Sequence, residues 1–121
     1  TPTTMAPEVI RAAKNASPRS DLYALGAVAY ELLCGAPVFA GGTSLEICAR
    51  HLHMDVVPPS VRASSPIPPS LESIVLRCLA KDPSERPASA AELAEALREC
   101  RDVPAWRAED AKDFWAHRKS A

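Results

Sequence analysis

The stretch DLYALGAVAYELLC, residues 21–34, decides the fold class. Its apolar side chains recur at helical spacing, and alanine and tyrosine fill most of the remaining positions. A helix that is apolar nearly all round lies in the centre of a domain rather than on its surface. Gly35 and Pro37 provide a stop signal just beyond it. We therefore predict a central helix over residues 21–34, with its apolar positions at Leu22, Leu25, Val28, Ala29, Leu32 and Leu33.

The same region is nearly long enough to cross a membrane, because residues 22–42 contain a single charge, Glu31. Glycine and proline interrupt the run after residue 34, and a buried helix followed by a loop explains it without placing Glu31 in lipid. The sequence therefore predicts no membrane segment here.

Shorter helices are predicted on the downstream side. Thr43 or Ser44 can cap a helix through about Met54, with Leu45, Cys48 and Leu52 on one stripe. Five prolines between residues 57 and 69 predict a long, stiff loop.

Two amphipathic helices follow that loop. Ser70 is predicted to cap the first, and Ser89 with Glu92 forms the pattern of a capping box at the start of the second. No segment alternates with a period of two, so the chain is predicted to be all-α. The apolar stripes are Leu71, Ile74, Val75, Cys78 and Leu79 in the first helix, and Leu93, Ala96, Leu97 and Cys100 in the second.

The C-terminal tail holds three of the six aromatic side chains, Trp106, Phe114 and Trp115. Their size and the helical spacing around them predict an amphipathic helix over residues 105–118, docked against the rest of the chain or a neighbouring domain. A partly helical linker is the alternative. The residues expected to face solvent are Glu109, Asp110, Lys112 and Asp113.

Composition limits the possible functions. The 121 residues suffice for one ordinary domain, and the formal net charge of -1 provides no broad basic surface for nucleic acid. The four cysteines form no C-x-x-C pair and fall on or beside apolar faces, which favours buried reduced thiols and a cytoplasmic protein. They are Cys34, Cys48, Cys78 and Cys100.

Three short motifs together carry a family resemblance. The chain opens with TPTTMAPE (residues 1–8), continues with SDLYALG (residues 20–26) and later contains DPSERP (residues 82–87). In this order and at these separations they resemble the C-terminal lobe of a Hanks-type serine/threonine protein kinase. The proline loop and final helices are similar to those of bacterial members. The resemblance assigns residues 1–100 to that helical lobe, without the N-terminal lobe, and leaves residues 101–121 as a tail helix or linker.

The resemblance implies structural roles for Glu8, Arg86 and Asp21. The family pairs the acid that matches Glu8 with the arginine that matches Arg86; the alternative is two solvated surface charges. The aspartate that matches Asp21 holds the catalytic loop in the family, whereas a plain helix cap is the local alternative.

Substrate contacts are implied at Thr1 and Thr4. Thr1 matches a threonine in the loop that receives the residue after the phosphoacceptor, which marks serine/threonine specificity; an ordinary loop hydroxyl is the alternative. Thr4 stands where the family commonly has tyrosine, so the wall of the substrate pocket departs from the family pattern there.

The residues that perform phosphoryl transfer in this family are not found in the sequence. There is no Gly-rich phosphate loop, no His-Arg-Asp and no Asp-Phe-Gly. We therefore expect no catalytic residue in this chain, and no bound ATP or Mg²⁺, although the intact kinase would use both. The chain opens at Thr1 without methionine, so we expect an N-terminal kinase portion as its partner, together with a protein substrate. The alternative is a non-catalytic pseudokinase lobe or a helical interaction module.

A metal site is not expected either. His51 and His53 fall on different faces of their predicted helix, and although Cys48 lies one turn before His51, no further ligand completes a site. Both histidines are predicted to be solvated. Ser64 and Ser65 have no paired histidine and acid, so nucleophilic catalysis has no support.

Overall fold

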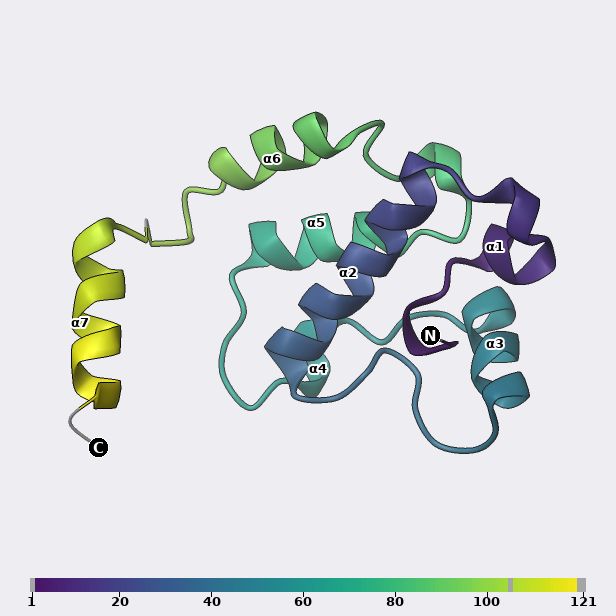
Figure 1. The fold of residues 1–121 in the computed structure, drawn as a ribbon, viewed down its shortest axis with the longest axis horizontal. Coiled ribbons are helices and arrows are strands. Elements are labelled where there is room, and N and C mark those ends of the chain that lie inside the picture. Colours follow the sequence, from purple (N-terminus) through teal and green to yellow (C-terminus); the bar gives the residue numbers. More distant parts are fainter. Residues whose placement is uncertain (1, 105, 120–121) are drawn as a thin grey trace.

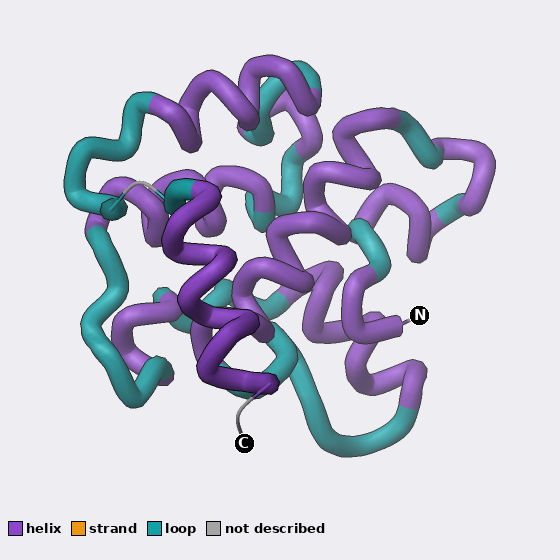
Figure 2. The backbone as a smooth tube through the Cα atoms, turned by 60° about the vertical axis from the view of Figure 1, so that its left-hand side comes forward, coloured by secondary structure: helices purple, strands orange, loops and turns teal. Residues whose placement is uncertain are grey.

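The computed structural model describes residues 2–104 and 106–119, and these residues form helices and loops without a β-strand (Figures 1 and 2). The prediction of an all-α fold is confirmed. Helix α2 crosses the middle of the molecule, and the shorter helices lie around it (Figure 1). The elements in chain order are η1 (Pro2–Thr4), α1 (Pro7–Arg11), η2 (Ala13–Asn15), α2 (Pro18–Cys34), α3 (Ser44–His53), α4 (Pro59–Arg62), α5 (Pro69–Cys78), η3 (Pro83–Glu85), α6 (Ala90–Arg98) and α7 (Ala108–Lys119).

Helix α2 begins three residues before the predicted start at Asp21. Pro18 occupies the first turn, where its missing N–H costs nothing, and the Ser17 backbone N–H donates to Ser20 Oγ at 3.1 Å. The helix ends as predicted at Cys34, because Gly35 adopts the left-handed conformation with φ 75°. Asp21 is therefore not the cap; it lies exposed in the first helical turn.

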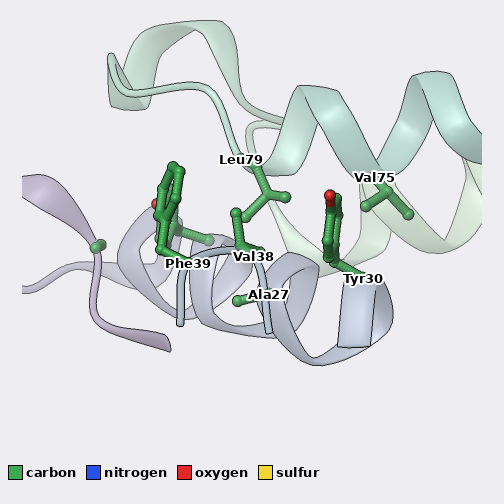
Figure 3. Packing of buried hydrophobic residues seen from close by; sticks show 8 residues of the cluster. Ala27, Tyr30, Val38, Phe39, Val75 and Leu79 are labelled. Atoms are coloured by element: carbon green, nitrogen blue, oxygen red, sulfur yellow. The ribbon is translucent and has the colours of Figure 1, made fainter. Parts of the chain in front are cut away.

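The core lies between one face of α2, helix α5 and the loop after α2 (Figure 3). Figure 3 shows Tyr30 and Ala27 of α2 facing Val75 and Leu79, with Val38 and Phe39 of the loop alongside. A smaller cluster joins Leu22, Cys78 and Leu93, and so connects α2 and α5 to α6.

The other face of α2 departs from the prediction. Leu25, Val28 and Leu32 are exposed, although the helix was predicted to be buried all round. Leu25 and Val28 keep about half of their surface exposed, at 51% and 44%, and Leu32 is 82% exposed. The sequence pattern was therefore correct for the central position of α2 and wrong for its burial within this chain.

Gly26 allows α2 and α5 to approach closely. A Cβ atom added there would lie 2.7 Å from Cys78 Cβ and 3.4 Å from Leu79 Cγ. We expect Gly26→Ala to destabilise the fold: overpacking costs about 1 to 3 kcal/mol, which outweighs the gain of roughly 1 kcal/mol in helix propensity. Urea denaturation followed by circular dichroism measures the effect, with Ser73→Ala on the exposed face of α5 as the control. Stabilisation by Gly26→Ala would show that the two helices can separate freely.

Helix α3 buries a different face from the one that the sequence pattern indicated. Thr43 is its cap, with Thr43 Oγ1 accepting from the Glu46 N–H at 3.2 Å. Leu45, on the apolar stripe predicted from the sequence, is 80% exposed, whereas His51 is fully buried. The expectation that His51 is solvated is wrong, because its ring is enclosed by aromatic side chains of two other segments.

The region predicted as a proline loop contains a helical turn, α4, because Pro59 suits a first helical position. Helix α5 begins at Pro69, so Ser70 is not its cap. Instead, the Ser70 backbone N–H donates to Asp102 Oδ2 at 3.1 Å, which attaches the chain after α6 to the start of α5. In α6 Ser89 is the cap, as predicted, because Ser89 Oγ accepts from the Glu92 N–H at 3.1 Å. The second bond of the predicted capping box is replaced: Glu92 Oε2 accepts from the Ala88 N–H at 3.3 Å rather than from Ser89.

The tail forms the predicted helix, α7, but does not bury its aromatic side chains. Figure 1 shows α7 to one side of the other helices, and Trp106, Phe114 and Trp115 are all exposed. Phe114 contacts both tryptophans edge to face, so the three rings cover each other rather than the lobe. Docking against this lobe is therefore not observed for the described residues; the predicted segment also included Ala105, which lies outside them.

The four cysteines are free thiols, but only Cys78 is fully buried. Cys34, Cys48 and Cys100 are half-buried, so the prediction of buried thiols was correct for one of the four. Within the described residues no helix combines the length and apolar character needed to cross a bilayer.

Candidate functional site

The first and last motifs of the sequence meet in an ion pair. Arg86 Nη1 donates to Glu8 Oε2 at 2.7 Å, and Arg86 Nη2 donates to Glu8 Oε1 at 2.9 Å. The two side chains come from positions 78 residues apart in the chain. Arg86 is 2% exposed, and Glu8 keeps only a small exposed fraction. The predicted pair is thus present, buried and bidentate, the geometry that gives the strongest charge-assisted hydrogen bonds.

Arg86 also binds three backbone carbonyls. Its Nε donates to Ala80 O at 2.7 Å, Nη1 donates to Arg19 O at 3.0 Å, and Nη2 donates to Lys81 O at 3.3 Å. Its guanidinium lies 4.9 Å from the centre of the Tyr23 ring. One side chain therefore connects α1, the first turns of α2 and the turn after α5. We call the group formed by Glu8, Ser20, Tyr23 and Arg86 the Arg86 anchor.

Glu8 is held ionised by this anchor. Burial alone would raise its pKa, but hydrogen bonds from Arg86 and from Ser20 Oγ, which donates to Glu8 Oε2 at 2.7 Å, outweigh it. The net result lowers the pKa of Glu8 from its ordinary value of 4.5 to about 2. Between about pH 2 and pH 4.5, Glu8 therefore binds fewer protons in the folded state than in the unfolded chain.

This difference predicts acid sensitivity. The contribution of Glu8 to stability is fully present above about pH 5 and is lost as the pH falls through 4.5 toward 2, a change of about 3 kcal/mol. Urea denaturation at a series of pH values measures it. In the Glu8→Gln variant the free energy of unfolding should lack this part of its dependence on pH. The same dependence in the variant and the unaltered protein would contradict an ionised Glu8 in the anchor.

The segment that precedes the anchor in the chain forms η1. The Met5 backbone N–H donates to Pro2 O at 3.5 Å in η1, and η1 packs against α2 and α3. Thr4 is half-buried in η1, whereas Thr1 lies outside the described residues. Asp21 lies exposed in the first turn of α2.

A buried aromatic group lies beneath η1, and sequence reasoning missed it. Tyr23 Oη lies 2.6 Å from His51 Nδ1, and the rings of Tyr23 and Phe39 both contact His51 edge to face. Lys81 Nζ donates to His51 O at 2.9 Å. The only available signal was the position of His51 one helical turn after Ile47, a pattern too weak to overcome the polarity of histidine.

Within residues 2–104 and 106–119, no group of three histidine, cysteine or acidic side chains could hold a metal ion. The acidic side chain with the most lowered pKa, Glu8, is already occupied by Arg86. The hydrogen bonds of Arg86 hold α1, the start of α2 and the turn after α5 together.

Comparison with known proteins agrees with the order of the motifs. A sequence model described as the protein kinase domain matches residues 1–98. The chain belongs to the protein kinase family. The resemblance found in the motifs and the helical C-lobe-like fold are therefore confirmed.

Bacterial serine/threonine kinases are among its relatives. The chain is 44% identical to the serine/threonine-protein kinase PknB of Mycolicibacterium smegmatis over 75 residues, which cover 62% of this chain and 12% of that kinase. It is 38% identical to pkn3 of Myxococcus xanthus over 91 residues (74% and 16%), and 33% identical to PknL of Mycobacterium tuberculosis over 120 residues (97% and 30%). The chain thus spans less than a third of the length of each of these kinases.

Proposed function

We propose that this chain is the substrate-side helical lobe of a serine/threonine protein kinase, an enzyme that transfers the γ-phosphate of ATP to protein hydroxyl groups. Residues 1–100 form the lobe, and residues 101–121 form a tail. The observation that carries the proposal is the bidentate Glu8–Arg86 pair, because it connects the two family motifs into one buried anchor. The names of the relatives support the serine/threonine class.

In this proposal the Arg86 anchor holds η1 as the surface that receives the protein substrate. Thr4 lies in η1, and Thr1 is assigned to the same surface from the family motif. A fixed substrate surface contributes to the rate by orientation, since the reacting hydroxyl must be placed in line with the phosphoryl group. We assign Asp21 the role of holding the catalytic loop of the complete enzyme.

Nucleotide and magnesium binding are assigned to residues outside this chain. The sequence lacks the family motifs for both, and the described residues offer no metal-binding cluster. The exposed leucines and valine of α2 support a further helical segment packing there in the complete kinase. Its need for ATP places that enzyme in the cytoplasm.

The first test uses the chain alone. Calorimetric titration with Mg-ATP should give no binding heat. A micromolar dissociation constant at one site would contradict the assignment of nucleotide binding to other residues.

The second test transfers the lobe into a related kinase. The matching segment of PknL of Mycobacterium tuberculosis, 33% identical over 120 residues that cover 97% of this chain, is replaced by that of this chain. The chimera should phosphorylate a protein substrate, and the Arg86→Ala change should reduce that activity at least about tenfold. The Arg98→Ala change, in an exposed side chain of α6, is the control. A folded chimera that binds Mg-ATP but transfers no phosphate would favour a pseudokinase lobe.

A further inference from the structure

The buried ring of His51 has one nitrogen without a partner. The Tyr23 hydroxyl occupies Nδ1 at 2.6 Å, whereas Nε2 is the one buried side-chain polar atom with no hydrogen bond among the described residues. A fully buried polar atom left unpaired is costly, so a structure that keeps one requires an explanation.

The surroundings of His51 indicate which nitrogen carries the proton. Burial, followed by the positive charge of Lys81, lowers the pKa of His51, so the ring is neutral at pH 7. A neutral imidazole has one N–H donor and one acceptor nitrogen. Helix α3, which carries His51, packs against η1, and the backbone of Thr3 and Pro2 acts to raise the pKa of the ring, as neighbouring carbonyl acceptors do.

These contacts are compatible with one tautomer. If Nδ1 accepts the Tyr23 hydroxyl proton, the ring proton sits on Nε2, where the carbonyls of η1 are the available acceptors. The reverse tautomer would turn the Nε2 lone pair toward carbonyl oxygens, which is repulsive. Four groups surround His51. The rings of Tyr23 and Phe39 contact its ring, Lys81 Nζ binds its backbone carbonyl, and η1 packs against its helix, α3.

We propose that His51 is a positioning residue for the substrate-facing segment: its Nε2–H attracts the backbone carbonyls of residues 2 and 3 and thereby sets the path of η1. Tyr23 fixes the tautomer and also lies against Arg86, so the same tyrosine connects His51 to the Arg86 anchor. Only the description of η1 as substrate-facing rests on the proposed function. The contact itself is a property of this chain.

Nuclear magnetic resonance of the 121-residue chain tests the tautomer. With ¹⁵N-labelled histidine, long-range proton–nitrogen spectra should show His51 protonated at Nε2 and acceptor-like at Nδ1, and the signal should keep this form as the pH falls through 6.5. An Nδ1–H tautomer would overturn the proposal, and this measurement needs no variant.

Hydrogen exchange tests the effect on η1. His51→Leu removes both nitrogens, whereas His51→Gln keeps a donor near the Nε2 position. We expect His51→Leu to speed exchange of the Met5 amide at least about fivefold relative to the Leu79 amide of α5, and His51→Gln to restore most of the difference. His53→Leu, in an exposed side chain of the same helix, is the control.

The outcomes separate this proposal from the kinase proposal. Equal acceleration at Met5 and Leu79 would mean that His51 only contributes to global stability, and would overturn the positioning role. Neither readout depends on phosphoryl transfer, so an inactive chimera would leave the His51 result standing.

Discussion

Replacing Arg86 by alanine is expected to lower the free energy of unfolding by about 3 to 5 kcal/mol, because it leaves the Glu8 carboxylate buried without its partner. The backbone carbonyls of Ala80, Arg19 and Lys81 lose a donor at the same time. Glu8→Gln should cost less, about 2 to 3 kcal/mol, because Arg86 keeps those three acceptors. Urea denaturation at pH 7 measures both values.

A second ion pair in the chain provides a matched control. Arg77 Nη2 and Glu92 Oε1 are also 2.7 Å apart, but both side chains are nearly half exposed. Solvent screens such a pair, so Arg77→Ala should change stability by no more than about 1 kcal/mol. Similar losses for Arg77→Ala and Arg86→Ala would show that burial does not decide the strength of the anchor.

The Leu79→Ala change is expected to cost about 2 to 5 kcal/mol, because it leaves a cavity in the main core. Leu79 is 1% exposed and packs among the core side chains between α2 and α5 (Figure 3). Circular dichroism is the appropriate signal, since both tryptophans, Trp106 and Trp115, lie exposed in the tail and do not report on this core.

The control for this prediction is Leu32→Ala on the exposed face of α2. Leu32 is 82% exposed, so its removal should change stability by no more than about 0.5 kcal/mol. A loss below 1 kcal/mol for Leu79→Ala would contradict the assignment of the core to this face of α2.

Local signals in the sequence predicted the longer helices. Gly35 marked the end of α2, because glycine readily adopts the left-handed conformation that closes the helix there. The spacing of apolar residues identified α5 and α6. The Glu8–Arg86 pair could be predicted only through the family resemblance, since nothing local connects positions 78 residues apart.

Most of the errors came from long-range contacts. His51 is buried because Tyr23, 28 residues earlier, supplies a hydrogen-bond partner that no local pattern shows. Leu45 lies on the outward face of α3, and Leu32 on the outward face of α2, because the buried side of a helix is set by its neighbours and not by its own apolar residues. The start of α2 was missed because Ser17 and Pro18 were not recognised as a helix-starting pair.

The account depends most directly on Glu8 and Arg86 acting as one unit. A double-mutant cycle with Glu8→Gln, Arg86→Ala and the double variant measures this coupling at pH 7. The double variant should lose about 2 kcal/mol less than the sum of the single losses, because each single variant strands or weakens the same pair. Additive losses would show that the two side chains contribute independently and would contradict the anchor.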